Sequence, residues 1–509
     1  MFQGSKNSEK CNRNILSFAG RTHSRNLHFM TQQVKQLLSD SKVIRWTALA
    51  LISLTMLAAY YFVDMIAPLQ KLVQQDYQWT AANYGFFSGS EYLLNVLGFL
   101  IISGIILDKM GIRFTGLTAA SVMLAGGLVK LYGLSDYFNT GGFGYSFFSS
   151  FLTSLPPSAK VAALGYGIFG IGIEMAGITT SRTVVRLFTG KELALAMGMQ
   201  LATARLGASI AFFFSANFAG YREVDKLVDG QTVRLLEGHV LNPVYVGIAL
   251  VAIGFLTFLI YTFMDRKLDQ QTGKSSKGSD PTEEFHVRDL RKIITNRGFL
   301  LISFLCVLFY SGVFPFLKYA VDMMQTKLHV SPEMGGKIAG LLPVGTILLT
   351  PVFGYLLDTK GKGATLMILG SALLTLAHLT FALVSLNMAI AIIAIVVLGI
   401  AFSLIPASMW PSVPKIVEER YLGSAYALVF WIQNIGLWFF PWLIGMILDL
   451  VNPGIAELIS KGDVSAFYNY KIPMLVFAGL GVCAIVLAFL LRREDRLKKY
   501  GLEAPNKKK

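Results

Sequence analysis

Residues 162–212 read AALGYGIFGIGIEMAGITTSRTVVRLFTGKELALAMGMQLATARLGASIAF: one apolar run, a short basic hinge and a second apolar run. Each run carries one charge near its middle, Glu174 in the first and Arg205 in the second. A charged side chain at bilayer depth is costly unless it faces the protein interior and finds a partner. Opposite charges on two neighbouring spans therefore predict a small site for a zwitterion inside a membrane transporter.

The whole chain has the composition of a polytopic membrane protein. Of its 509 residues, 54% are hydrophobic and only 15% are charged, whereas soluble domains carry about a quarter charged residues. About a dozen apolar stretches approach or exceed the ~20 residues that a spanning helix needs. The sequence contains no G-x-S-x-G, H-E-x-x-H or P-loop motif, so we expect a protein that is not an enzyme. Three scattered cysteines indicate no metal site, and we predict no cofactor.

The basic residues set the topology. The net charge of +15 arises from Lys and Arg that crowd the N-terminal arm, the connector 265–297 and the C-terminal tail. Cytoplasmic segments of membrane proteins carry this excess, so we place both termini and the connector in the cytoplasm, and we expect no nucleic-acid partner. The sequence has no Asn-x-Ser/Thr site, which favours a bacterial inner membrane.

The order of apolar runs predicts an all-α membrane protein with twelve transmembrane helices in two six-helix halves. The N-terminal arm is polar without an apolar signal region, and the protein starts at Met1 or at Met30. The predicted parts are a cytoplasmic arm 1–42, an N-terminal half 43–264, a cytoplasmic linker 265–297, a C-terminal half 298–491 and a basic cytoplasmic tail 492–509.

One internal repeat supports this division. GIILDKMGIR at 104–113 and GYLLDTKGKG at 354–363 share a G-x-x-x-D-x-x-G pattern offset by 250 residues. Each copy follows the second span of its half. The pattern resembles a loop motif of the major facilitator superfamily, whose halves are parallel repeats. We assign it to gating and fold, through Gly104, Asp108, Gly111, Arg113, Gly354, Asp358 and Gly361.

Glu174 and Arg205 both fall about 20 Å along their spans at 1.5 Å per residue, near the membrane midplane. Arg205 is the one Lys or Arg that we cannot place near a span end. The alternative is a structural ion pair between the two spans. Further polar and aromatic residues are candidates for lining the same site: Glu91, Asn95, Asp64, Tyr61, Tyr310, Trp410, Gln433 and Asn434.

Other motifs have structural interpretations. Gly165, Gly167 and Gly170 form a G-x-G-x-x-G pattern. No strand precedes it, so we expect close packing of two membrane helices rather than a dinucleotide site. Lys318 and Asp322 are four residues apart and predict a local pair. His378 is expected to be packed and hydrogen-bonded, and the long loop 135–160 to form a short amphipathic segment.

Several segments together resemble one family more closely: YYFVDMIAPLQ from Tyr60, TGKELALAMGMQLATARLG from Thr189, MWPSVP from Met409 and YLGSAYALVFWIQNIGL from Tyr421. They are similar to the lysosomal dipeptide uniporters of the major facilitator superfamily and their bacterial relatives. The resemblance implies facilitated diffusion of dipeptides, with the family's midplane acid at Glu174 and its basic residue at Arg205. The resemblance also leaves open an accessory subunit for this chain, since the animal members of the family have a glycosylated one.

The predicted function is therefore dipeptide transport by alternating access. The nearest rival is a proton-coupled symporter of peptides or small organic anions, although the E-x-x-E-R signature of proton-driven peptide carriers is absent from the first span. A receptor or scaffold without transport is a third class, and the midplane charges argue against it.

Overall fold

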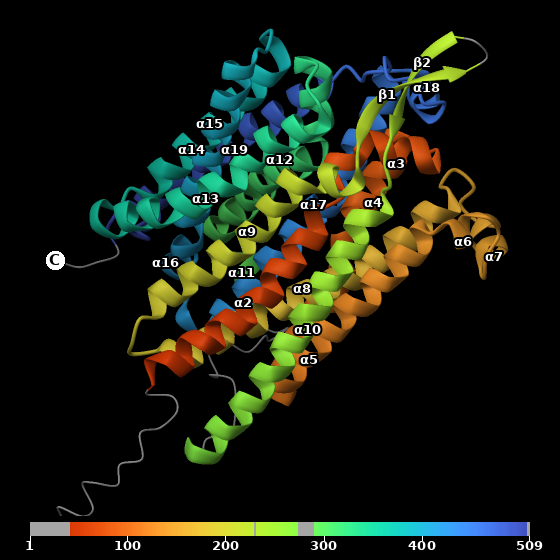
Figure 1. The fold of residues 1–509 in the computed structure, drawn as a ribbon. Coiled ribbons are helices and arrows are strands. Elements are labelled where there is room, and N and C mark those ends of the chain that lie inside the picture. The colour runs from red at the N-terminus through yellow and green to blue at the C-terminus, as the bar shows by residue number, and fades with distance from the viewer. Residues whose placement is uncertain (1–40, 229–230, 273–289, 506–509) are drawn as a thin grey trace, which may run out of the picture.

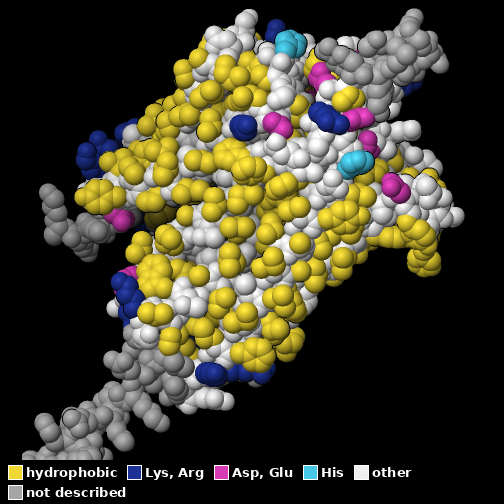
Figure 2. Space-filling model, in the orientation of Figure 1, with side chains coloured by type: hydrophobic (Ala, Val, Ile, Leu, Met, Phe, Trp, Pro, Cys, Tyr) yellow, Lys and Arg dark blue, Asp and Glu magenta, His cyan; other side chains and the backbone are white. Residues whose placement is uncertain are grey.

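The computed structural model describes residues 41–228, 231–272 and 290–505. Most of the predicted arm 1–42, the middle of the predicted linker 265–297 and the last four residues of the tail lie outside this part. Within it, eleven helical stretches are long and apolar enough to cross a membrane. Figure 2 shows hydrophobic side chains covering the flank of the bundle between its two ends. The fold is the all-α membrane architecture that the sequence predicts.

Twelve crossings follow once the longest stretch is divided. Ala81–Leu134 is 54 residues long, and as one straight helix it would hold its ends about 80 Å apart. Instead, the Tyr77 hydroxyl donates to the Leu134 carbonyl at 2.7 Å, so both ends lie together. The chain turns at Gly111, whose φ of 80° and ψ of 174° break the helix. Only glycine adopts such a conformation readily.

The N-half comprises α2 to α10 and the C-half α12 to α19 (Figure 1). The N-half elements are α2 (Lys42–Asp64), a 3-10 turn (Ala67–Leu69), α3 (Gln70–Tyr77), α4 (Ala81–Leu94), a π-helical segment (Asn95–Phe99), α5 (Leu100–Leu134), α6 (Asp136–Asn139), α7 (Tyr145–Ser149), α8 (Pro157–Phe188), α9 (Leu193–Ala219), β1 (Arg222–Val228), β2 (Gln231–Glu237) and α10 (Leu241–Thr272).

A short helix, α11 (Leu290–Ile294), precedes the C-half. The C-half elements are α12 (Arg297–Leu328), α13 (Pro332–Lys360), α14 (Gly363–Leu383), α15 (Met388–Met409), a 3-10 turn (Trp410–Ser412), α16 (Val413–Ile416), a 3-10 turn (Glu419–Tyr421), α17 (Leu422–Val451), α18 (Ile455–Ser460) and α19 (Lys471–Lys498). Side-chain caps fix several starts: Asn296 accepts from Phe299 N at 3.2 Å, and Asn387 from Ile390 N at 2.9 Å.

The purely helical prediction missed one hairpin. β1 pairs with β2 antiparallel, from Arg222 opposite Glu237 to Val228 opposite Gln231. It projects from one end of the bundle, which we call the hairpin end (Figure 1). The sequence carries a sign of it, because Asp229 and Gly230 separate two short runs and Asp-Gly favours two-residue hairpin turns.

The opposite end is the motif end, where both copies of the repeated glycine motif lie. α13 begins beside the hairpin end, where Asn217 of α9 contacts Glu333 through its side-chain amide. It then runs for 29 residues, or about 43 Å, before it reaches Gly361. The first copy lies where the Ala81–Leu134 stretch turns, at Gly111.

Small residues bring α8 close to both α5 and α4 inside the N-half. A Cβ built on Gly165 would lie 2.2 Å from Lys130 N, and one on Gly170 would lie 1.7 Å from the Glu91 carbonyl oxygen. No side chain fits such gaps, so glycine is required at both positions. This confirms the packing interpretation of the G-x-G-x-x-G pattern.

Candidate functional site

Arg205 lies between the two halves. Its guanidinium carbon is 5.6 Å from the Tyr60 ring of α2, 5.6 Å from the Phe314 ring of α12 and 5.0 Å from the Phe402 ring of α15. The side chain is half-buried. Aromatic faces attract a cation but accept none of the guanidinium N–H groups in a normal hydrogen bond. The donors of Arg205 therefore remain available to a ligand.

Glu174 on α8 is half-buried as well. Among the described residues, no basic side chain lies within 4.0 Å of its carboxylate, and no carboxylate lies within 4.0 Å of Arg205. Tyr60 lies within electrostatic reach of both charges. The structural ion pair considered as an alternative is thus not formed in this conformation. Two opposite, unpaired charges instead flank one interior region.

An aromatic group from the C-half continues from Arg205. The Tyr310 ring is stacked on Phe314 with 5.8 Å between centroids. Trp410 Nε1 donates to the Tyr310 hydroxyl at 3.0 Å, and the Trp410 ring stacks on Phe430 at 4.7 Å. The predicted residues Tyr310 and Trp410 therefore adjoin the rings that contact Arg205, and they offer a largely apolar surface beside the basic pole.

Glu91 and Asn95 occupy neighbouring turns on the N-half side. Glu91 is 3% exposed, and the Tyr166 hydroxyl lies 3.0 Å from its carboxylate. Asn95 is fully buried and donates to the Gly170 carbonyl at 3.0 Å, while its Oδ1 has no partner. It opens the π-helical segment, a feature frequent at functional sites. Both residues line the interior face where α4 meets α8.

Asp64 takes part in a contact that crosses the halves. Lys318 Nζ of α12 donates to Asp64 Oδ1 at 2.8 Å and to the Val63 carbonyl at 3.1 Å. The predicted local pair between Lys318 and Asp322 is therefore wrong. Asp322 accepts instead from the Tyr470 hydroxyl at 2.5 Å. Burial raises the pKa of the Tyr470 phenol well above its ordinary value, so the hydroxyl keeps its proton.

Three further predicted residues make their contacts within one half. Tyr61 is fully buried in the N-half, with its hydroxyl 3.5 Å from the Pro243 carbonyl of α10. Tyr60 contacts Arg205 in its place, because successive helical residues point about 100° apart. Gln433 accepts from Cys306 at 3.3 Å inside the C-half, and Asn434 beside it has an unpartnered Nδ2.

The repeated motif forms its contacts within each half. Asp108 accepts from Arg182 of α8 at 2.8 Å, and Arg113 lies 2.8 Å from Asp269 of α10. Gly111 and Gly361 both have positive φ, at 80° and 70°. A Cβ on Gly104 or Gly354 would meet no atom within 4 Å. Thus the residues around the turn fasten helices of one half, while the first glycine of each copy faces open space.

One charged residue escaped the sequence analysis. Lys130 of α5 is fully buried, so Arg205 is not the only basic residue deep in the protein. It lies four residues before the end of α5 at Leu134. α6 covers that end of α5: Phe138 is fully buried there and contacts Tyr132.

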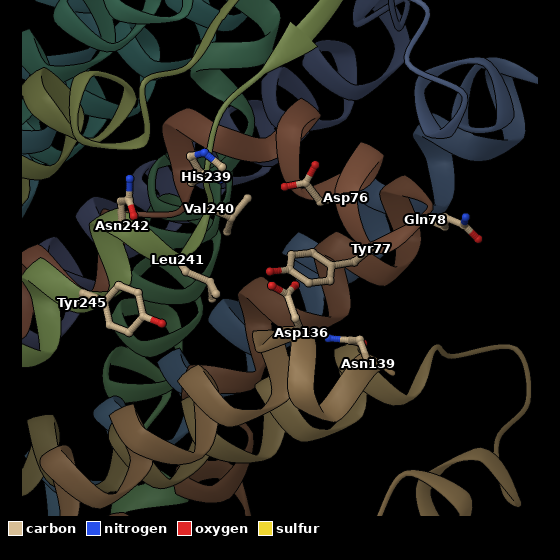
Figure 3. A pocket seen from close by; sticks show the side chains of 10 residues that line it. All are labelled: Asp76, Tyr77, Gln78, Asp136, Asn139, His239, Val240, Leu241, Asn242 and Tyr245. Atoms are coloured by element: carbon tan, nitrogen blue, oxygen red, sulfur yellow. The ribbon is translucent and has the colours of Figure 1, made fainter. Parts of the chain in front are cut away.

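A separate hollow lies at the hairpin end (Figure 3). Its volume is about 520 Å³, and Asp76, Tyr77, Asp136 and His239 are among the residues that line it. It contains none of the predicted site residues. Among the described residues, no group of three His, Cys, Asp or Glu side chains has the arrangement of a metal site.

Comparison of the sequence with family models finds the Major Facilitator Superfamily over residues 52–441 and again over 316–508. Relatives of similar sequence include the lysosomal dipeptide transporter MFSD1 of Mus musculus, 27% identical over 88% of this chain and 87% of that protein. The Homo sapiens protein of the same name is 26% identical over 86% of this chain and 83% of its own length.

Solved structures of similar fold share little sequence. A bacterial homologue of the human lysosomal transporter Spinster superposes with a TM-score of 0.62 at 14% identity, over 89% of this chain and 98% of that one. A D-xylose–proton symporter has a TM-score of 0.59 at 15% identity, over 88% and 97%. These structures support the two-half helical fold.

Proposed function

The chain belongs to the major facilitator superfamily and is a multi-pass membrane transporter, and from that premise we propose that it carries dipeptides between Glu174 and Arg205. The observation that carries the proposal is the pair of opposite, unpaired charges in the protein interior. A zwitterion supplies the missing partner to each charge at once. Without a ligand, each half-buried charge lacks a partner of opposite charge.

Each pole has a distinct task. Arg205 binds the substrate carboxylate through two parallel N–H···O bonds, which its planar fork favours. Glu174 accepts from the α-ammonium. Tyr60, Phe314 and Phe402 hold the guanidinium in place, and the surface of Tyr310 and Trp410 receives an apolar side chain. Glu91, Asn95 and Asp64 line the N-half side of the route.

The choice of dipeptides over free amino acids rests on the relatives. A free amino acid carries both charges on one carbon, whereas a dipeptide separates them by an added residue. The Mus musculus and Homo sapiens relatives are named as dipeptide transporters. Their names support the substrate class here, and Arg205 and Glu174 supply the chemistry that would recognise it.

Transport proceeds by alternating access in this proposal. In the present conformation the hairpin end is closed across the halves by Lys318–Asp64 and by Asp449 of α17, which accepts from Ala81 N and Ala82 N of α4. We assign the motif end and residues 265–297 to the cytoplasm, from the distribution of Lys and Arg. A cysteine at Thr140 should react with an impermeant thiol reagent outside intact cells, and one at Thr359 should not.

The membrane in which the protein resides also belongs to the proposal. The relatives named above are lysosomal proteins of animals, so they lend no support to the predicted bacterial inner membrane. That prediction rests on the absence of glycosylation sites from the sequence. An accessory subunit like that of the animal family stays an open alternative.

We propose uniport rather than proton coupling. The rival symporter has one observation in its favour, the buried carboxylate of Glu91 with its single hydroxyl neighbour. In proteoliposomes, a dipeptide gradient alone should drive counterflow, and an imposed pH gradient should not concentrate the substrate. Uphill accumulation driven by inward-directed protons would replace uniport with the symporter.

Uptake of a labelled dipeptide into proteoliposomes tests the transport function itself. Arg205→Ala should abolish uptake, Arg205→Lys should restore little because the fork is lost, and Glu174→Gln should lower uptake similarly. Arg222→Ala and Glu457→Gln remove exposed charges at the hairpin end and serve as controls with near-normal uptake. Wild-type liposomes that take up no dipeptide above protein-free ones would contradict the proposal.

A further inference from the structure

Lys130 has a buried side-chain amine without a hydrogen-bond partner. It is 0% exposed, and its Nζ has no partner among the described residues. Three rings surround the amine instead: Tyr166 at 4.1 Å, Phe62 at 4.6 Å and Phe87 at 5.1 Å from their centroids. The cage is built from α2, α4 and α8, around a side chain from α5. None of the roles proposed above uses this lysine.

The cage alone does not account for a lysine at this position. Ring faces attract a cation, but they satisfy none of the three N–H donors of an ammonium group. A methionine would fill the same apolar space without an unsatisfied charge. A buried, unpartnered polar group therefore suggests a partner that the present conformation does not provide.

Two carboxylates, those of Glu91 and Asp64, lie within electrostatic reach of Lys130. Tyr166 links the groups, since its hydroxyl lies 3.0 Å from Glu91 and 2.7 Å from the Val63 carbonyl, while its ring faces the amine. Lys318 is the other cation that acts on the same carboxylates. The cluster thus has two acids and two lysines.

The two lysines belong to different halves. Asp64, Glu91 and Lys130 all lie in the N-half, on α2, α4 and α5, whereas Lys318 lies on α12 of the C-half. Opening of the hairpin end separates α12 from α2 and removes Lys318 from Asp64. Loss of one partner from a buried ion pair is strongly destabilising, because the other charge stays behind.

We propose that Lys130 is a reserve cation, which leaves its aromatic cage to pair with Asp64 and Glu91 when the hairpin end opens. Lys318 pairs with Asp64 in the closed conformation, and Lys130 takes over this role in the open one. The inference rests on the alternating access proposed above. It makes Lys130 a positioning residue for the transport cycle, without contact to substrate.

The proposal predicts effects of opposite sign from two similar substitutions. Lys318→Met removes the cation of the closed hairpin end and should shift the population toward the open one. Lys130→Met removes the cation of the open hairpin end and should shift it toward the closed one. The double variant lacks both and should return toward the wild-type ratio. A merely structural lysine would lower stability without opposing the effect of Lys318→Met.

The population is measured with spin labels at Asp76 and Lys461, two exposed positions on opposite halves of the hairpin end, by double electron–electron resonance in liposomes. Each single variant should change the open-to-closed ratio on the order of tenfold. Lys160→Met is the matched control, because Lys160 is a buried lysine that binds backbone carbonyls of residues 148 and 151 rather than a carboxylate. It should leave the ratio unchanged.

The outcomes separate this inference from the proposed function. A wild-type protein with one fixed label distance, with or without dipeptide, would contradict alternating access itself. A wild type that populates both distances, with Lys130→Met unshifted or shifted toward open, would overturn the reserve-cation role alone. If Lys130→Met does not fold, Lys130→Gln is used instead, because it removes the charge while it keeps a polar side chain. A shift toward the closed hairpin end would support the reserve-cation role, and no shift or a shift toward the open one would overturn it.

Discussion

At the two ends of the interface between the halves, the backbones of the halves approach each other to different degrees. At the hairpin end, a Cβ on Gly89 would lie 2.2 Å from the Trp438 carbonyl oxygen, and one on Gly445 would lie 2.1 Å from that of Ala81. At the motif end, Gly104 and Gly354 have no atom within 4 Å of the same position. Glycines therefore serve contact at one end and face open space at the other.

Polar contacts repeat this difference. At the hairpin end, Lys71 donates to the Val464 carbonyl at 2.8 Å and Gln74 to the Tyr468 hydroxyl at 3.1 Å, both across the halves. At the motif end, Arg182 pairs with Asp108 and Arg297 with Glu494, each within one half. The first end is closed by contacts across the halves, which the proposed transport cycle would break, and the second carries contacts that hold each half together.

The largest effect is expected from a change within one half at the motif end. Asp265 lies 3.0 Å from Arg186 and 3.6 Å from Arg113. Asp265→Asn should lower the free energy of unfolding by about 3 kcal/mol, because two guanidinium groups lose a buried partner. Thermal unfolding in detergent measures the loss, with Glu457→Gln as an exposed control. If Asp265→Asn changed the distance between the labels at the hairpin end without lowering stability, the motif end would not act within one half alone, and the contrast between the two ends would fail.

A bulky residue at the close contact should act on the equilibrium instead. Gly445→Val places a side chain against the Ala81 carbonyl, and overpacking typically costs about 1–3 kcal/mol, roughly a five- to 150-fold shift toward an open hairpin end. Gly104→Val at the motif end meets open space in this conformation and should not open the hairpin end. Label distances at Asp76 and Lys461 report both. Equal shifts from the two variants would show that the glycines do not distinguish the ends.

A smaller shift is expected from a helix cap that crosses the halves. Asp449 of α17 caps the first turn of α4 by accepting from Ala81 N and Ala82 N at 3.0 and 2.8 Å. Loss of a cap costs about 1 kcal/mol, so Asp449→Ala should favour the open hairpin end about fivefold. Ser331→Ala removes a cap within the C-half, where Ser331 accepts from Met334 N. It should lower stability alone, and an equal opening by both variants would contradict the account.

Much of the fold follows from local patterns in the sequence. The second apolar run of the stretch 162–212 lies in α9 (Leu193–Ala219), because apolar runs of membrane length must be helical in lipid. The relation of the two halves came from the repeated G-x-x-x-D-x-x-G pattern. The hairpin was missed because a long polar segment between spans was treated as a loop, although an Asp-Gly pair in the sequence favours a hairpin turn.

Contacts that join distant parts of the chain were not predictable in the same way. Lys318 pairs with Asp64, 254 positions away, and the helical spacing of Lys318 and Asp322 favoured the wrong partner. Lys130 was not singled out, because the three rings that enclose it come from α2, α4 and α8, which are distant from it in the sequence. Arg205 and Glu174 were identified because their depth depends only on position within each span.

The central claim is that Arg205 and Glu174 bind opposite ends of one dipeptide, and a cycle of ligand and protein changes tests it most directly. Binding of a free dipeptide, its C-amide and its N-acetyl form is measured by calorimetry to wild type, Arg205→Ala and Glu174→Gln. Each blocking group, the C-amide or the N-acetyl group, should weaken binding to wild type by about 2–5 kcal/mol, or roughly 30- to several-thousand-fold. Arg205→Ala should bind the C-amide almost as well as it binds the free dipeptide, because the partner of the carboxylate is already missing. Glu174→Gln should likewise bind the N-acetyl form almost as well as the free dipeptide. Two results would contradict the claim. Either the blocking groups leave binding to wild type unaffected, or the C-amide weakens binding to Arg205→Ala, and the N-acetyl group binding to Glu174→Gln, as much as each weakens binding to wild type.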